Sequence, residues 1–238
     1  MKIIVFDIKG KFAHFRKFYT NSSSLTYGIP PRTAICGILA AILGLERDSY
    51  YEKFSSKKVH IAVKKLNSTR KIMQTLNYIR ATSMSELIKP RQHTQVPFEV
   101  LVGENGVNFR IYLGAEDGNL LRELEKRLKE NRTIFPPYLG SANFGCSISY
   151  VGRFEGKAIT NDDMVSLNTV VRSDQIKDID ISEYSGRLIK ERMAADFSID
   201  RTINRVETYI YDDDGKPIDV KLKDEYISLT NGEYIVFM

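Results

Sequence analysis

Cations and aromatic rings alternate in one short segment near the amino terminus. Residues 9–19 read KGKFAHFRKFY, so positive groups and rings stand close together directly after an apolar run. Single-stranded nucleic acids are bound by this mixture, because cations neutralise phosphates and rings stack on unpaired bases. A loop that is anchored by its phenylalanines and whose charges are solvated is the alternative interpretation. The candidate contact residues in this segment are Lys9, Lys11, His14, Phe15 and Arg16.

A second candidate is the segment YGIPPRT at residues 27–33, which runs into a predicted helix. Free backbone N–H groups at a helix start attract anions, and Arg32 adds a formal charge, although an ordinary cap explains the same residues. Gly37 lies within the helix, where glycine costs about 1 kcal/mol relative to alanine. A glycine at this place is understandable if another backbone, of protein or nucleic acid, passes close to it. We therefore take Tyr27, Arg32, Thr33 and Gly37 as candidate binding residues.

Two polar segments further along the chain are also candidates. Residues 135–145, FPPYLGSANFG, place glycines around small polar residues, which permits close approach of a ligand at Gly140 and Asn143. Residues 89–95, KPRQHTQ, are basic and lie between apparent strands. A structural turn and a solvated hairpin tip are the respective alternatives. The candidates from the basic segment are Lys89, Arg91, Gln92 and His93.

The sequence contains no convincing catalytic or metal-binding constellation. The only histidines are His14, His60 and His93, and none has a partner at metal-ligand spacing. No nucleotide-binding glycine loop, zinc-protease motif or serine-hydrolase motif occurs. The acidic run 212–214 is interpreted as a solvated turn. We therefore expect no metal, no cofactor and no catalytic residue.

Cysteine usage and hydropathy indicate the cellular compartment. Cys36 and Cys146 stand far apart without metal-ligand spacing, which is typical of free buried thiols in a reducing cytoplasm. The longest apolar run, residues 34–45, is shorter than the ~20 residues that span a membrane. The sequence thus predicts a soluble, cytoplasmic protein with no membrane partner.

The net charge of +5 is unevenly distributed. Residues 1–100 carry 17 Lys and Arg against 6 Asp and Glu, whereas the rest of the chain carries 18 against 24. Such a dipolar chain favours a polyanion on one side and a protein neighbour or solvent on the other. If the basic part holds nucleic acid, Lys9, Arg16, Tyr27 and Arg32 should line one common groove.

The periodicity predicts an α+β fold. Strands are expected at 2–8, 59–63, 70–82 and 147–153, with helices opening at 30–33 and spanning 116–132. Segments 96–102 and 108–113 are expected to pair through a turn at 103–106. This order is that of a ferredoxin-like domain over residues 1–155, with an insertion at about 70–100. Residues 156–238 are predicted to form a small β-rich part, with strands at 206–211, 217–220 and 234–237.

Two stretches resemble a known family. Residues 8–16 (IKGKFAHFR) and 26–44 (TYGIPPRTAICGILAAILG) resemble the amino-terminal signature of the fifth CRISPR-associated (Cas) protein family, in its type I-B form. The segment PYLG at 137–140 is similar to the family's second motif. The resemblance covers roughly a quarter of the chain and fades beyond residue 156.

The resemblance implies a role in antiviral defence. Such proteins have a ferredoxin-like (RRM-like) domain of the RAMP superfamily with a β-hairpin thumb, and they cap one end of the Cascade complex. They hold the 5′ handle of the CRISPR RNA and contact the backbone subunit and the large subunit, while target DNA is read by the guide. By position, residues 89–95 would be the thumb tip, and residues 27–33 with Gly37 would face the handle.

Two other functions remain open from the sequence. One subtype of the family is a metal-independent repeat endoribonuclease that uses a tyrosine and a neighbouring Lys-His pair. Tyr27 matches the tyrosine, but Lys89 and His93 stand four residues apart and no Lys-His dipeptide occurs. The resemblance thus favours a non-catalytic role. The other alternative is a scaffold that binds only protein through its basic half.

Overall fold

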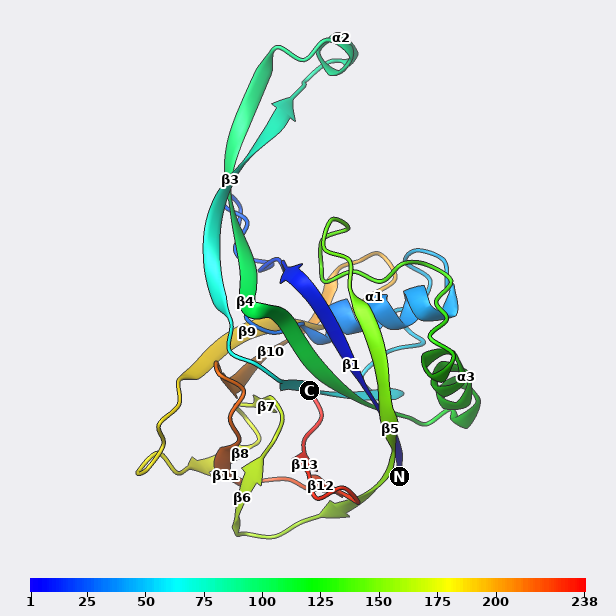
Figure 1. Cartoon of the computed structure of the whole chain (residues 1–238), viewed down its shortest axis with the longest axis vertical. Coiled ribbons are helices and arrows are strands. Elements are labelled where there is room, and N and C mark those ends of the chain that lie inside the picture. Colours follow the sequence, from blue (N-terminus) through cyan, green and yellow to red (C-terminus); the bar gives the residue numbers. More distant parts are fainter.

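The protein is built around one curved antiparallel sheet of seven strands (Figure 1). The computed structural model describes residues 1–238. The strands β5, β1, β4 and β2 lie side by side in this order, β12 and β13 extend the sheet beyond β5, and β3 pairs with β4. The bounds are β1 (Lys2–Ala13), β2 (Val59–Lys65), β3 (Arg70–Arg80), β4 (Gln92–Ala115), β5 (Ser147–Ile159), β12 (Tyr226–Leu229) and β13 (Tyr234–Ile235).

Two helices cover one face of this sheet. Helix α1 (Arg32–Leu43) connects β1 to β2, and α3 (Gly118–Lys129) connects β4 to β5. Ile4, Phe6 and Ile8 of β1 share a core with the apolar stripes of both helices, whereas Ile3 and Val5 pack on the other face with β12 and β13. Because both faces of this part of β1 are buried, residues 3–6 form a continuous apolar run.

Both predicted helices are confirmed. Pro31 in extended conformation precedes α1, and Gly44 ends it in the left-handed region at a φ of 72°, which glycine adopts without a steric penalty. Helix α3 is amphipathic, and its buried face contains the expected leucines at 120, 121, 124 and 128 together with Glu125.

The predicted turn at residues 103–106 is wrong. The segments before and after it belong to the single strand β4, and both pair with β1, as Phe12 faces Val102 and Gly10 faces Val107. Residues 103–106 therefore form a bulge within the strand. Gly103 is needed there because a Cβ atom would lie 2.1 Å from the backbone oxygen of Gly106.

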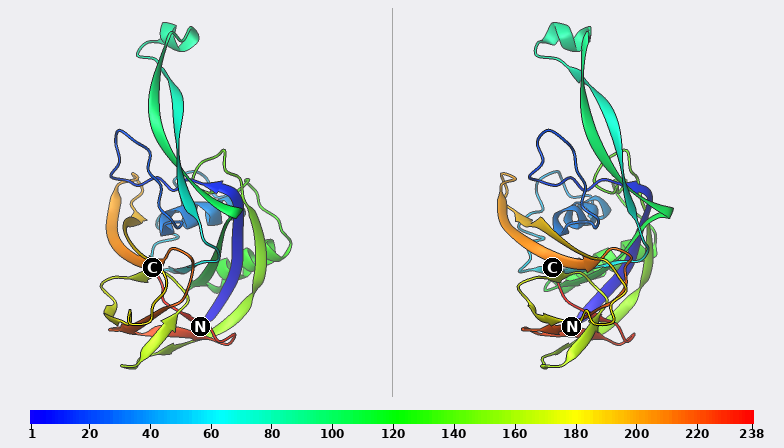
Figure 2. Two further views of the ribbon diagram at one scale, coloured as in Figure 1. Left: turned by 60° about the vertical axis from the view of Figure 1, so that its left-hand side comes forward. Right: turned by 90° about the vertical axis from the view of Figure 1, so that its left-hand side faces the viewer.

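The strand that β4 does pair with as a hairpin is β3. Their pairing runs from Arg70 opposite Val102 to Arg80 opposite Gln92, and α2 (Met84–Ile88) crosses the tip. Figures 1 and 2 show this arm projecting far from the rest of the molecule. Its outer side chains are almost all exposed. The segment expected to form an insertion thus extends away from the core.

The carboxy-terminal part forms two three-stranded sheets, β7-β10-β9 and β6-β11-β8. Met193 of β9 and Tyr209 and Tyr211 of β10 belong to the same core as α1. Helix α1 is therefore enclosed between the main sheet and the β9–β10 pair (Figure 2). Strand β9 and several of the short strands were not predicted from the sequence. The bounds are β6 (Met164–Leu167), β7 (Val171–Arg172), β8 (Ile176–Ile179), β9 (Leu188–Phe197), β10 (Ile203–Asp212) and β11 (Ile218–Leu222).

Acidic residues of the carboxy-terminal half neutralise cations of the amino-terminal half. All five of these ion pairs are at least partly buried, so these cations do not face a polyanion, contrary to the expectation from the charge distribution. The pairs are Lys17–Glu191 (2.8 Å), Lys71–Glu191 (3.3 Å), Arg32–Asp196 (2.7 Å), Lys64–Glu233 (2.7 Å) and Lys65–Asp213 (2.7 Å).

The expectation of free thiols is confirmed, since Cys36 and Cys146 form no disulfide. Burial raises the pKa of Cys36 to about 11 and that of Cys146 to about 12. Neither thiol is therefore a ready nucleophile at neutral pH. None of the helices has the length and hydropathy needed to cross a lipid bilayer.

Candidate nucleic-acid interface

A groove of about 840 Å³ runs along one side of α1. Four segments that are distant in sequence form it: the residues after β1, helix α1 with the turn that follows it, the loop between α3 and β5, and the β9–β10 turn. We call it the α1 groove. Its lining includes Arg16, Thr33, Gly37, Arg47, Tyr50, Phe135, Tyr138, Gly140, Phe197 and Arg201.

The α1 groove combines exposed rings with arginines. Phe135 is 50% exposed and Tyr138 is 46% exposed. Arg16 forms no ion pair, and its guanidinium donates to the backbone oxygen of Thr20 at 3.2 Å. Arg47 and Arg201 make only exposed contacts with one acid, Asp48, at 3.4 and 3.5 Å. Such weak pairs leave the guanidinium groups available to an incoming phosphate.

Gly37 faces the α1 groove without a protein neighbour. A Cβ atom at this position would meet only the Tyr50 hydroxyl, at 3.5 Å, which is an ordinary contact. No backbone of this protein passes close to Gly37, so packing within the chain does not require the glycine. Thr33 lies one turn earlier on α1 and lines the same groove. Three of the predicted residues, Arg16, Thr33 and Gly37, thus lie together in the structure.

Gly140 contacts the protein's own backbone. Its φ is 83°, and a Cβ atom would lie 2.0 Å from the backbone oxygen of His14. The neighbouring Leu139 is buried and accepts a hydrogen bond from the His14 N–H at 3.0 Å. The glycine therefore allows the loop to pack on the residues after β1. This packing explains why residue 140 is a glycine, without the close approach of a ligand that was expected. Asn143 is exposed in the same loop, outside the groove lining.

The side chains of His14 and Phe15 belong to the interior. His14 is 5% exposed, stacks on Phe98 at 4.0 Å, and bonds the Glu99 backbone oxygen at 2.7 Å and the Ser24 hydroxyl at 3.0 Å. Burial lowers its pKa, although the bond to Glu99 opposes this shift. Phe15 is 2% exposed and packs in the main core. The prediction that Phe15 stacks on a base is wrong, because its ring is covered.

Tyr27 and Arg32 are also buried, at 2% exposure each. The Tyr27 hydroxyl donates to the backbone oxygen of Arg192 at 2.7 Å, and burial raises the pKa of this phenol. Arg32 donates to Phe54 and Val59 backbone oxygens at 2.6 and 2.8 Å, besides its pair with Asp196. The predicted anion site at the start of α1 is wrong, because β9 covers it.

The remaining predicted residues are exposed but lie elsewhere. Lys9 and Lys11 are at the end of β1, whereas Lys89, Arg91, Gln92 and His93 are at the arm tip. None of these cations forms an ion pair within the chain. Lys9, Arg16, Tyr27 and Arg32 therefore do not share a groove, and that expectation is wrong. The predicted set divides into the α1 groove, the core, the arm tip and the end of β1.

Sequence comparison identifies the family. The family model described as CRISPR-associated protein (Cas_Cas5) matches residues 3–210, which is most of the chain and includes the α1 groove and β9–β10. The chain belongs to the Cas5 family. Among curated proteins, no sequence matches it.

Solved structures share the fold of this Cas5-family chain. A CRISPR protein from Archaeoglobus fulgidus superposes with a TM-score of 0.61 at 13% identity, covering 100% of this chain and 99% of that one. A chain of a CRISPR RNA-guided surveillance complex gives 0.55 at 10% identity, covering 91% of each chain. A chain of the type III-B Cmr-beta complex bound to cognate target RNA and AMPPnP gives 0.51 at 11% identity, covering 92% and 86%.

Several groove residues of this Cas5-family protein were not predicted as site residues. Tyr138 and Phe135 belong to a segment that was singled out, and their apolar rings in a polar loop were a usable signal. Arg47 and Arg201 carried no such signal. Arg47 follows α1 directly, whereas Arg201 reaches the groove only because β9 and β10 fold back over α1, and sequence periodicity does not specify this packing.

Proposed function

We propose that this protein is a non-catalytic subunit of a type I CRISPR Cascade effector complex, in which it binds the 5′ handle of the CRISPR RNA and caps one end of the assembly. Its neighbours there would be the backbone subunit and the large subunit, and target DNA would be read by the guide. The observation that carries the proposal is the α1 groove, where exposed rings and arginines surround Gly37. Rings that stack on bases contribute ~1–3 kcal/mol each, and arginines neutralise phosphates.

The fold supports the same assignment. We infer a ferredoxin-like domain from the strand order β5-β1-β4-β2 with α1 and α3 on one face. The arm would serve as a thumb, since it projects from the edge of this domain (Figure 1) and its tip is basic. Arg80, Lys89 and Arg91 are exposed and form no ion pair.

The environment of Tyr27 agrees better with a binding role for this protein than with a catalytic one. The phenol is buried and already hydrogen-bonded to Arg192. Lys89 and His93, the other members of the alternative nuclease site, stand at the far end of the arm. A catalytic group must reach the proton that it transfers. We therefore expect purified protein to leave repeat RNA uncut without metal. A specific product that disappears in Tyr27→Phe would favour the endoribonuclease instead.

The handle-binding proposal is tested by filling the groove in the assembled complex. Gly37→Gln places a side chain in the groove while improving helix propensity, so the fold should be retained. We expect retention of CRISPR RNA to weaken about tenfold at moderate salt, and Tyr138→Ala to weaken it similarly because a stacking ring is removed. The measurement is RNA occupancy of the purified complex over a salt titration.

Gly118→Gln is the matched control. Gly118 also lies in a helix, and a Cβ atom there meets nothing within 4 Å, so RNA occupancy should not change. Equal RNA occupancy in wild type, Gly37→Gln and Tyr138→Ala would contradict the proposal that the handle binds in the α1 groove. Failure of this chain to crosslink to RNA in the complex would favour the protein-only scaffold.

A further inference from the structure

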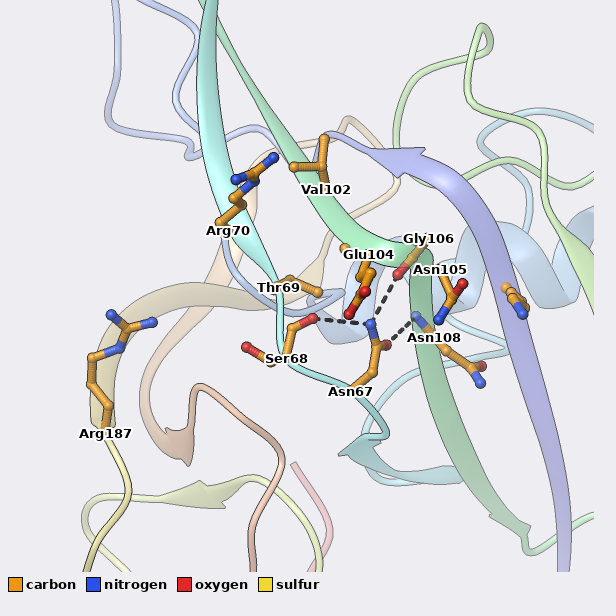
Figure 3. Close-up of a pocket in the computed structure, with 12 residues that line it drawn as sticks. Asn67, Ser68, Thr69, Arg70, Val102, Glu104, Asn105, Gly106, Asn108 and Arg187 are labelled. Carbon is orange, nitrogen blue, oxygen red and sulfur yellow. Dashed lines mark hydrogen bonds between the residues drawn. The ribbon is translucent and has the colours of Figure 1, made fainter.

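A polar hollow of about 770 Å³ lies at the base of the arm, outside the α1 groove (Figure 3). The end of β1, the segment before β3, the bulge of β4 and the residue before β9 form it. Lys9 alternates with Ile8, which points to the helices, so Lys9 lies on the opposite face of the sheet. We call it the arm-base hollow. Its lining includes Lys9, Thr69, Arg70, Glu104 and Asn108.

The arm-base hollow is held in shape by hydrogen bonds within the chain. The Asn67 amide donates to the backbone oxygens of Ser68 at 3.0 Å and Gly106 at 2.9 Å, and its oxygen accepts the N–H of Asn108 at 2.9 Å. Figure 3 shows these bonds between the segment before β3 and the bulge. Gly106 has a φ of 86°, and a Cβ atom there would lie 2.4 Å from the Gly10 oxygen. The bulge is therefore a fixed feature of the strand.

Two buried polar atoms in this lining have no partner. Thr69 is 5% exposed, and its hydroxyl makes no hydrogen bond. The side-chain oxygen of Asn108 is likewise buried and unpaired. An unsatisfied buried polar group costs roughly 1–3 kcal/mol, so each such group needs an explanation. A polar ligand that enters the hollow and displaces the side chains covering these two atoms would supply the missing partners.

The charges of the lining specify the kind of ligand. Lys9 and Arg70 are exposed and form no ion pair, and Arg187 at the rim shares its charge with Asp213. Glu104 is the one acid of the lining and is also unpaired. Only one lining residue, Val102, is hydrophobic. The hollow thus lacks the rings that stack on bases and the apolar anchors of protein interfaces.

We propose that the arm-base hollow binds the sugar–phosphate backbone of single-stranded RNA, as a site separate from the α1 groove. Arg70 and Lys9 would contact phosphates, and the Thr69 hydroxyl and the Asn108 oxygen would bond the ribose–phosphate unit. The Glu104 carboxylate can accept a hydrogen bond from a ribose 2′-hydroxyl, which DNA lacks. Binding there is independent of base sequence, because the contacts are to phosphates and ribose, which all nucleotides share.

The test measures binding of the full chain to a mixed-sequence single-stranded RNA by fluorescence anisotropy across a salt titration. We expect Lys9→Ala/Arg70→Ala to weaken binding about tenfold, and to reduce the salt slope by about 0.7 for each phosphate that is no longer neutralised. The charge-matched control is Lys57→Ala/Lys126→Ala, which removes two exposed, unpaired cations outside both sites and should change affinity less than about twofold. Equally weakened binding in the two double variants would overturn the proposal.

Thr69→Val gives a sharper result, because it removes the hydroxyl and keeps the shape. Since the hydroxyl is unpaired in the free protein, thermal stability should be unchanged or higher, while RNA affinity falls several-fold. Unchanged affinity would contradict the site. DNA of the same sequence should bind more weakly, and Glu104→Ala should reduce the difference. Equal or tighter binding of DNA in the wild type would overturn the assignment to RNA.

The outcome is distinguishable from that of the handle-binding proposal. If both sites bind RNA, the reductions in affinity from Gly37→Gln and from Lys9→Ala/Arg70→Ala multiply in the combined variant. An effect of the hollow variant alone would reject the α1 groove and keep this inference. An effect of Gly37→Gln alone would do the reverse. RNA–protein crosslinks mapped by mass spectrometry to residues 67–70 or 104–106 would support the hollow directly.

Discussion

Arg32 is the largest of the fully buried side chains in this protein. Its guanidinium joins three segments, since it bonds the backbone of Phe54 and Val59 and pairs with Asp196 at the end of β9. Buried charges persist only when paired and hydrogen-bonded. Arg32 therefore holds the carboxy-terminal sheet against the start of α1.

At this residue, we expect Arg32→Met to lower the free energy of unfolding by about 3 kcal/mol, because it removes the ion pair with Asp196 and the hydrogen bonds to two buried carbonyls. Urea unfolding followed by circular dichroism measures this destabilisation. Arg16→Ala is the control, since Arg16 is exposed and unpaired, and it should change stability by less than about 0.5 kcal/mol. Equal unfolding midpoints of wild type and Arg32→Met would contradict the structural role.

At the scale of elements, contacts with the end of β1 fix the position of the loop between α3 and β5. Leu139 is fully buried, the N–H of His14 donates to its oxygen, and Gly140 passes against the His14 backbone. This contact places Tyr138 at the α1 groove. The glycine serves the positioning of the loop, and the exposed ring beside it is available to a ligand.

Gly140→Ala should therefore destabilise the protein by about 2–4 kcal/mol, because of the positive φ and the clash with His14. Gly145→Ala lies in the same loop, where a Cβ atom meets nothing within 4 Å, and should have little effect. Thermal melts of the two variants give the comparison. Similar melting temperatures would show that the loop does not need this close approach.

At the scale of the whole molecule, Glu191 joins body, arm and carboxy-terminal sheet. Its carboxylate accepts from Lys17 after β1, from Lys71 at the arm base and from Tyr211 of β10, at 2.8, 3.3 and 2.8 Å. Burial by itself would raise the pKa of Glu191, but Lys71, Lys17 and the Gly28 N–H outweigh it, so the pKa is lowered. Glu191, Asp196, Asp213 and Glu233 of the acidic half thus serve as counterions for cations of the basic half.

A lowered carboxyl pKa in the folded state contributes stability above the unfolded pKa, near 4.3, and this contribution disappears as the pH falls below it. We expect the urea midpoint to drop between about pH 4.5 and pH 3, and Glu191→Gln to drop less over that interval while being less stable at pH 7. Glu183→Gln, at an exposed and unpaired position, should follow the wild type. Parallel curves for wild type and Glu191→Gln would refute the linkage.

The sequence alone was sufficient for features that depend on neighbouring residues. Gly44 ends α1 because only the local backbone decides a left-handed cap, and the leucine stripe of α3 follows from helical spacing. The family resemblance in residues 8–44 was confirmed by the match over residues 3–210. Of the predicted site residues, Arg16, Thr33 and Gly37 do line one groove.

Tertiary structure decided which of the candidate binding residues are buried and which are exposed. Tyr27 and Arg32 are typical of a binding segment by residue type, but β9 and β10 pack over them and bury both. The same packing brings Arg201 to the α1 groove and pairs the basic half with the acidic half. Residue type and periodicity specify what a side chain can do, whereas its access to a ligand depends on segments more than 100 residues away.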